Sequence, residues 1–338
     1  MITASDIRIV RQELADAGLF ERREARTWGK LALLLGTAFG LIALHTILPL
    51  WGTALLLPVT AFFFSAAAMI GHEGGHRSLS KSAFRCELLY HLVFPMLGGL
   101  GALQWKDKHN VRHHGHPNVV GIDDDMEIWP LANTRAEHLR AGPIRRFVQR
   151  HAQGWLWWPM TALFTWSIKV DSIGSLIRYA RKNGIDRSWL LDVSAQLMHY
   201  VIWLVLPSLA WGFLPVFGFY LAIFGLVSVM LALVFTTGHM GLPILRDRSN
   251  GWDVQFQTTR NLELPRWLSF FFVGLDYQIE HHLFPKIPHA NLPRAAAIVR
   301  PWAERLGVPY HSLPYGRAIA EVTRFVDRAW RIEAISGA

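Results

Sequence analysis

The sequence predicts an all-α integral membrane protein: four transmembrane helices form two hairpins, and a cytoplasmic helical cap holds a di-metal centre. Three observations predict it. Only 17% of the 338 residues are charged, against about 25% in soluble domains. Segments 31–71 and 193–245 contain no Asp, Glu, Lys or Arg. Half of the sixteen histidines lie in three short windows. The charge pattern excludes a secreted protein, a disulfide scaffold and an ordinary cytosolic enzyme.

The two uncharged segments predict the transmembrane helices. One crossing of a bilayer takes about 20 apolar residues, so segments of 41 and 53 residues each hold two crossings. Pro49–Gly52 divides the first segment and Trp211–Pro215 divides the second. The predicted helices are 31–50, 52–71, 190–211 and 216–238.

The positions of the charges predict the topology. Both dividing turns are uncharged, so two hairpins leave every charged residue on one side of the membrane. Six basic residues precede Leu31, and an excess of Lys and Arg marks the cytoplasmic side. We therefore expect both chain termini and the metal site to be cytoplasmic. The net charge of +9 reflects this topology, and nucleic acid is not an expected partner because no basic run accompanies it.

We predict one domain, 1–338, in five parts. Its N-terminal helix has Ile7, Val10 and Leu14 on one face, which is typical of a helix lying on a membrane surface. Two shorter uncharged stretches, Leu88–Trp105 and Ala152–Ile168, are expected to be re-entrant or surface-lying. The five parts are the amphipathic segment 1–30, hairpin one 31–71, the cap 72–189, hairpin two 190–238 and the cytoplasmic C-terminal part 239–338.

The histidine windows predict the chemistry. In the first, His72 and His76 have i,i+4 spacing, which places both imidazoles on one side of a helix. The second and third windows each contain a His-His doublet. In the four-helix topology all three windows meet at the cytoplasmic end of the helices. The predicted ligands are His72, His76, His109, His113, His114, His281 and His282.

Seven imidazoles exceed what one zinc ion needs, so the windows predict two metals. Neutral imidazole also suits iron, and an all-nitrogen pair at a membrane surface indicates non-haem iron and oxygen chemistry. Carboxylates that could orient the imidazole N–H groups, or bind metal themselves, accompany the windows. They are Glu73, Asp123, Asp124, Asp125, Asp276 and Glu280.

These motifs resemble the membrane-bound fatty acid desaturases with three histidine boxes. His72-x-x-x-His76 is similar to the first box and His109-x-x-x-His113-His114 to the second. Gln278-x-x-His281-His282 is similar to the third box of the acyl-lipid and front-end branch, in its glutamine variant. Pro117-Asn118 and the following Gly121–Asp125 also resemble that branch.

The resemblance implies an oxygen-dependent enzyme that forms a C=C bond in an acyl chain at two non-haem irons, with O2 as co-substrate. It implies that His239 is a further ligand, and it leaves open whether Gln278 binds iron. His116 is a candidate ligand or supporting residue. No catalytic residue is predicted beyond the ligands, and no substrate-binding residue is identified. The expected partners are an acyl-lipid, acyl-CoA or acyl carrier protein substrate, membrane lipid and a separate electron donor, either ferredoxin or cytochrome b5 with its reductase.

Other functions stay open on the residues alone. The same ligands would serve a di-iron hydroxylase or ketolase of carotenoids, sphingolipids or alkanes, and His113-His114-Gly115-His116 resembles carotenoid hydroxylases. A haem protein could use His45 and His199, which lie inside predicted spans. A transporter is disfavoured because the uncharged segments hold no ion-carrying side chain.

Overall fold

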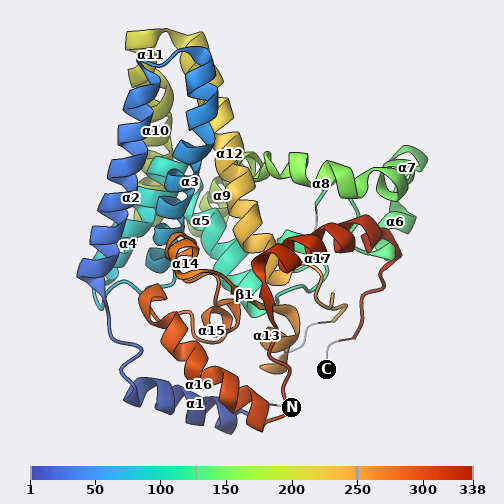
Figure 1. The fold of residues 1–338 in the computed structure, drawn as a ribbon. Coiled ribbons are helices and arrows are strands. Elements are labelled where there is room, and N and C mark those ends of the chain that lie inside the picture. Colours follow the sequence, from blue (N-terminus) through green and yellow to red (C-terminus); the bar gives the residue numbers. More distant parts are fainter. Residues whose placement is uncertain (1, 127, 248–250, 337–338) are drawn as a thin grey trace. The chain divides into compact units, whose positions relative to one another are not determined.

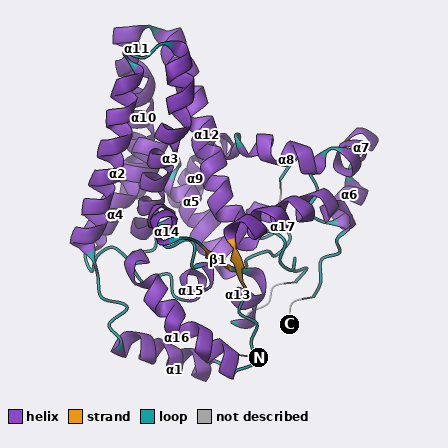
Figure 2. Ribbon diagram, viewed as in Figure 1, coloured by secondary structure: helices purple, strands orange, loops and turns teal. Residues whose placement is uncertain are grey.

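A computed structural model describes residues 2–126, 128–247 and 251–336. The predicted cytoplasmic ends, residue 1 and residues 337–338, lie outside this range. The described residues are mostly helical, and two short parallel strands, β1 (Asn261–Glu263) and β2 (Ser312–Pro314), pair with each other (Figures 1 and 2). It divides into two compact units. Unit 1 is Met1–Glu21, Lys108–Met160 and Leu233–Ala338, and unit 2 is Arg22–Asp107 and Thr161–Ala232.

Four of the described helices are long and apolar enough to cross a membrane, which confirms the predicted number of apolar spans. Pro49 precedes the second of them, and Gly212, with a φ of 76°, separates the third from the fourth. Proline and left-handed glycine both interrupt helices, which is why the breaks fall in the predicted turns. The four are α2 (Glu24–His45), α3 (Leu50–Gly75), α10–η4–α11 (Arg187–Trp211) and α12 (Phe213–His239).

Leu88–Trp105 lies in a bent pair of helices. Its first arm joins α4 (Ala83–His91) to the π-helix η1 (Leu92–Gly98), and its second joins α5 (Ala102–Trp105) to the π-helix η2 (Lys106–His113). The arms meet at 114°, the geometry of a broken span or a re-entrant loop. The other stretch, Ala152–Ile168, falls in α8 (Gln153–Thr161) and α9 (Phe164–Asn183), which are not among the four apolar spans.

Glycine lets the first arm pack closely on α3. A Cβ at Gly74 would lie 2.6 Å from the carbonyl oxygen of Cys86, and one at Gly71 would lie 2.8 Å from the Val93 side chain. No larger residue fits at either position without displacing the neighbouring helix.

Two polar side chains, those of Lys169 and Asp192, hold the two sides of the bend between the arms. At the end of η1, the amine of Lys169 donates to the carbonyl oxygen of Gly98 at 2.6 Å. At the start of α5, the carboxylate of Asp192 accepts from the backbone amides of Ala102 and Leu103, both at 2.9 Å. The start of a helix favours an anion at its amides, so the Asp192 carboxylate has the stabilising sign, and the Lys169 amine provides a donor for the carbonyl at the end of η1. Both side chains are buried.

Unit 1 contains the other helices and both strands. In the figure, α1 runs alongside α16 (Figure 1). The elements are α1 (Ala4–Asp16), η3 (Asp124–Met126), α6 (Arg135–Arg140), α7 (Pro143–His151), most of α8, α13 (Asp253–Thr258), α14 (Arg266–Phe272), α15 (Gln278–Leu283), η5 (His289–Asn291), α16 (Leu292–Arg305), α17 (Tyr315–Arg328) and η6 (Ala329–Arg331).

The N-terminal helix forms as predicted, but its predicted membrane contact is wrong. Ile7, Val10 and Leu14 are buried in one core cluster with Val299 and Trp302 of α16. An apolar face covered by protein gains its hydrophobic stabilisation there and is not available to lipid. Val322 and Val326 of α17 are likewise buried, in a second core cluster of unit 1.

Candidate metal centre

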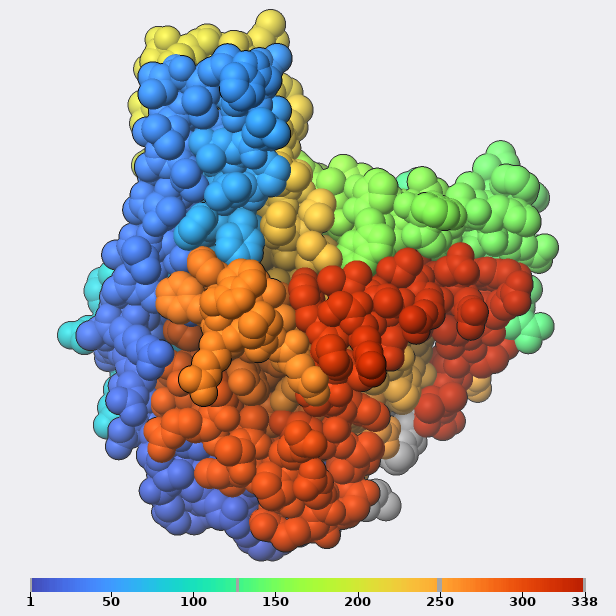
Figure 3. Space-filling model, viewed as in Figure 1, coloured from blue at the N-terminus to red at the C-terminus, as the bar shows by residue number. Residues whose placement is uncertain are grey.

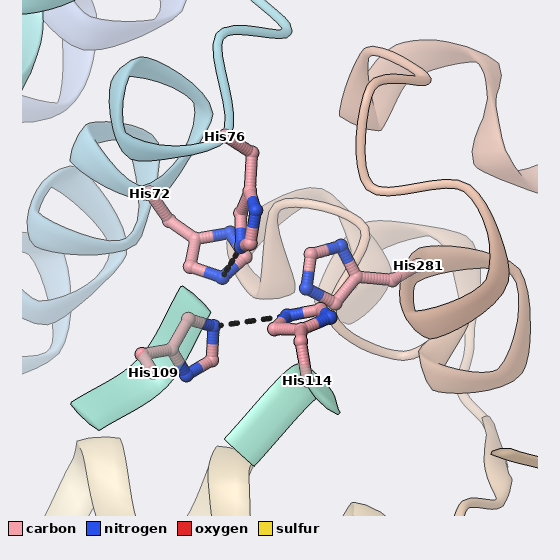
Figure 4. A group of neighbouring side chains, drawn as sticks. All are labelled: His72, His76, His109, His114 and His281. Atoms are coloured by element: carbon pink, nitrogen blue, oxygen red, sulfur yellow. Dashed lines mark hydrogen bonds between the residues drawn. The ribbon is translucent and has the colours of Figure 1, made fainter. Parts of the chain in front are cut away.

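The first histidine window lies at the end of α3 in unit 2. His72 is in the last turn of the helix and His76 is its C-cap. The helical i,i+4 spacing brings their Nε2 atoms to 3.0 Å, as the sequence predicts (Figure 4). Glu73 lies between them and accepts a hydrogen bond from the Thr27 hydroxyl at 2.9 Å. The side chains of His72, His76, Glu73 and Thr27 are all buried.

The second window includes a π-helix. His109 and His113 lie in η2, and His114 follows it directly. The wider π-helical turn places residue i+5 near residue i, whereas the tighter α-helical turn places residue i+4 there. The Nε2 atoms of His109 and His114 are accordingly 3.2 Å apart. π-Helical turns occur frequently at functional sites.

One group of imidazoles in unit 1 joins the second window to the third. The ligand nitrogens of His109, His114 and His281 lie within 4.8 Å of one another. Figure 4 shows these three rings turned toward one another, with His281 on α15. The rings of His114 and His281 are nearly perpendicular, with centroids 4.7 Å apart.

A second group in unit 1 consists of His113, His239 and His282. Their ligand nitrogens also lie within 4.8 Å of one another, and all three side chains are buried. The ring centroids are 4.6 Å apart for His113 and His239, and 4.7 Å apart for His239 and His282. His239, which only the family resemblance indicated, therefore lies with ligands from both doublets.

Hydrogen bonds at Nδ1 fix the ring orientations in this second group. The Nδ1 atom of His239 lies 3.1 Å from the carbonyl oxygen of Thr258, and that of His282 lies 3.0 Å from Gln255 Oε1. Each Nδ1 then carries the proton, which leaves Nε2 with a lone pair. Among the described residues, the buried Nε2 of His282 has no hydrogen-bond partner. A buried nitrogen lone pair among other imidazoles fits a metal ligand.

Asp123 supports His113. Its Oδ2 lies 3.0 Å from His113 Nδ1 and accepts from the backbone amide of Asn118 at 2.9 Å. Burial alone would raise the pKa of this carboxyl, but the charge and hydrogen bond of His113, together with the Asn118 amide, lower it to about 2. Asp123 is therefore a carboxylate, which fixes the ring of His113 with Nε2 toward the group.

The neighbouring aspartates face the basic residues of η2. Asp124 pairs with Arg112, and Asp125 pairs with Lys108 at 2.9 Å. Asp125 also lies 3.6 Å from His113 Nδ1. These pairs tie the loop that carries Asp123 to the helix that carries His113.

The remaining candidates have other contacts. Gln278 is buried against Gly238, where a Cβ would lie 2.7 Å from its Cγ. Burial raises the pKa of Glu280 to about 7, although the hydrogen bonds that its carboxylate accepts from Tyr310 and Asn261 act to lower it. Asp276 accepts from the Ser269 hydroxyl. Within the described part of the chain, His116 belongs to neither imidazole group.

Sequence reasoning missed several supporting residues. Gln255, Thr258 and Asn261 lie outside the histidine windows, and nothing in their local sequence marks them. Asn118 had a signal, since the Pro117-Asn118 pair stands out. Its side-chain amide donates to the carbonyl oxygens of His239 and Pro243, at 3.2 and 3.1 Å. With its backbone amide on Asp123, Asn118 links the surroundings of two ligands.

Comparison with known proteins gives one family. A family model described as fatty acid desaturase matches residues 46–314. The chain is 32% identical over 266 residues to the Delta(5) fatty acid desaturase fat-4 of Caenorhabditis elegans, covering 71% of this chain and 55% of that protein. It is 24% identical over 347 residues to the Delta(8)-fatty-acid desaturase 2 of Arabidopsis thaliana, covering 96% and 74%. An acyl-lipid (8-3)-desaturase of Thraustochytrium is 27% identical over 262 residues, covering 74% and 56%. The chain thus matches little more than half the length of two of these oxidoreductases.

Proposed function

We propose that this chain, which belongs to the fatty acid desaturase family, is an oxygen-dependent desaturase that introduces a C=C bond into a lipid-linked or carrier-linked acyl chain. The observation that carries the proposal is the pair of imidazole groups in unit 1, each with three ligand nitrogens within 4.8 Å of one another. The names of the relatives support an acyl substrate.

Two non-haem irons are the cofactors that this donor set suits best. We assign His113, His239 and His282 to one iron. We assign His109, His114 and His281 to the other, and we expect two further ligands from the first window, His72 and His76. The last two are included because their Nε2 atoms are 3.0 Å apart and because they match the first box of the family. The bound irons would supply O2 activation, with two electrons from a separate donor, for removal of two hydrogens from the acyl chain.

The protein's own residues prepare this site before metal binds. The carbonyl of Thr258, the amide of Gln255 and the carboxylate of Asp123 each occupy an Nδ1 position, so the Nε2 atoms are available in fixed directions. The assigned ligands other than His114, which is partly buried, are buried, and this keeps bulk water away from the metals and limits side reactions. Gln278 packs against Gly238 at the edge of this group, and we leave it as a supporting residue.

The four apolar helices support an integral membrane location. We propose that they form two hairpins, with both termini and the metal centre on the cytoplasmic side. The turn within each hairpin is uncharged, and six basic residues precede the first hairpin, which marks that side as cytoplasmic. A cytoplasmic centre would be accessible to a soluble or membrane-anchored electron donor of the ferredoxin or cytochrome b5 type.

Lipid analysis tests the proposal. The chain is expressed with an electron donor in a host, and fatty acid adducts are compared by gas chromatography and mass spectrometry with those of His282→Ala and His91→Ala cells. We expect products two hydrogens lighter in the parent and His91→Ala cells, and none with His282→Ala. His91 is a matched control because its ring bonds to its own helix, at the carbonyl of Glu87. Products heavier by one oxygen would identify the hydroxylase alternative, and unchanged lipids in cells containing the iron-loaded protein would contradict desaturation.

A further inference from the structure

The helix α7 exposes its apolar side. Ile144 and Phe147 lie one turn apart, with 83% and 65% of their surfaces exposed, whereas Gln149 on the opposite side is fully buried. A surface helix of a water-soluble domain has the reverse arrangement, with its apolar stripe on the core. The orientation of α7 therefore needs an explanation outside the packing of unit 1.

Buried hydrogen bonds fix that orientation. Gln149 Nε2 donates to the carbonyl oxygen of Pro130 at 2.9 Å, and its Oε1 accepts from His138 Nδ1 at 2.8 Å. Arg150 Nε donates to the other ring nitrogen of His138 at 3.2 Å. Turning Ile144 inward would break these bonds and leave buried polar groups without partners, which is costly. The exposed apolar side is thus the stable arrangement.

Further apolar side chains are exposed on either side of α7 in the sequence. Trp155 of α8 is 85% exposed, and Trp129 and Leu139 are also exposed. This part of the chain is green in Figure 3, where it lies at the molecular surface. Tryptophan is enriched where a protein meets the membrane–water interface, because its ring is apolar and its N–H is polar.

The same segment is strongly basic. Residues 135–151 contain one acidic residue, Glu137, and five arginines. Amphipathic helices with arginine beside an apolar face bind in the plane of a membrane interface, and basic charge near the surface favours anionic lipids. The arginines are Arg135, Arg140, Arg145, Arg146 and Arg150.

We propose that α7 lies in the interface of a membrane that contains anionic lipid. Ile144 and Phe147 enter the boundary between headgroups and acyl chains, and Arg140, Arg145 and Arg146 lie at the level of the lipid phosphates; Arg135 is paired with Glu333, and Arg150 bonds to His138. The occupant is lipid because the exposed side combines aliphatic, phenyl and indole groups with a positive charge, and because a chain with four apolar spans is surrounded by bilayer in any case. This contact is independent of the reaction at the histidines.

Site-directed spin labelling tests the proposal on the full chain in vesicles. The single cysteine is first removed by Cys86→Ser. Into this background one new cysteine at a time is introduced for the spin label, by Ile144→Cys, Phe147→Cys or Arg305→Cys. Arg305 is an exposed position on α16 of the same unit, so it is the aqueous control. Vesicles are made from phosphatidylcholine alone and from its mixture with phosphatidylglycerol. Collision of each label with oxygen, which concentrates in lipid, and with a water-soluble nickel complex reports its depth.

We expect nickel collision at 144 and 147 to be several-fold lower than at 305, oxygen collision to be higher, and both shifts to increase with phosphatidylglycerol. Nickel collision at 144 and 147 equal to that at 305 would overturn the lipid contact. Protection that appears only after an electron-donor protein is added would overturn it in favour of a protein interface. Equal depths in both vesicles would overturn the role of anionic lipid. Elution volume and iron content matching the parent protein show that each labelled variant is folded.

Discussion

The imidazole rings of His113 and His114, neighbours in the sequence, stand at 88° with centroids 5.8 Å apart, and they belong to different imidazole groups. The doublet His281–His282 is divided in the same way, with rings at 88° and centroids 5.7 Å apart. Each doublet therefore contributes one imidazole to each group. The rings of His114 and His282, one from each group, stack at 4.2 Å.

This division predicts how double variants combine. His113→Ala with His282→Ala removes two ligands from one group, so it should lower bound iron from about two to about one per chain, little further than either single change. His113→Ala with His114→Ala removes one ligand from each group and should bring bound iron close to zero. Iron analysis of the purified variants, with His91→Ala as control, checks the prediction. Equal iron content in the two double variants would mean that the groups do not bind metal separately.

Asp123→Asn tests the support of His113. Oδ2 of the carboxylate accepts from His113 and from the Asn118 amide, and Oδ1 accepts from the Asp125 amide. Asparagine keeps only one acceptor oxygen, so it cannot serve both sides, and it removes the charge beside the ring. Loss of such a partner usually costs about 10–100-fold in metal affinity. Asp16→Asn is the control, because Asp16 is an exposed residue of α1 whose carboxylate accepts from Gln12. Competition with an iron chelator measures both affinities, and the same affinity for the two variants would contradict the assigned role of Asp123.

Gly238→Ala tests the packing beside His239. The new Cβ would lie 2.7 Å from Gln278 Cγ, so the third box must shift or the end of α12 must move. Overpacking of this kind typically costs about 1–3 kcal/mol. Gly218→Ala in the same helix has no atom within 4 Å of the new Cβ and should be neutral or slightly stabilising. Thermal unfolding in detergent compares the two, and a Gly238→Ala protein as stable and as iron-rich as Gly218→Ala would refute the close contact.

Lys169→Met and Asp192→Asn test the bend before the second window. Lys169→Met leaves the buried carbonyl of Gly98 without its donor, and Asp192→Asn removes an acceptor from the amides of Ala102 and Leu103. An unsatisfied buried polar group costs about 1–3 kcal/mol, so both variants should unfold at lower temperature than the parent. Lys182→Met, at an exposed position of α9, should unfold as the parent does. If all three unfold alike, these hydrogen bonds do not hold the bend.

The sequence by itself determined the local features of this protein. The uncharged segments located four apolar helices, because a helix that crosses a bilayer must be long, apolar and internally hydrogen-bonded. The i,i+4 spacing of His72 and His76 already fixed their proximity, since helical geometry depends only on separation along the chain. The family resemblance added His239.

Only the tertiary structure decided which ligands share a group and which faces are covered. Two adjacent histidines have the same local sequence signal, and their separation into different groups depends on the π-helical turn and on the path that brings α15 and α12 to it. The partners of Nδ1 lie 19 and 27 residues away, where no local pattern marks them. The amphipathic helices α1 and α7 look alike in sequence, but α16 buries the apolar face of the first. The apolar face of α7 stays exposed because the buried hydrogen bonds of Gln149 hold the opposite side of the helix inward. Burying a polar group without a partner costs more free energy than exposing an apolar one.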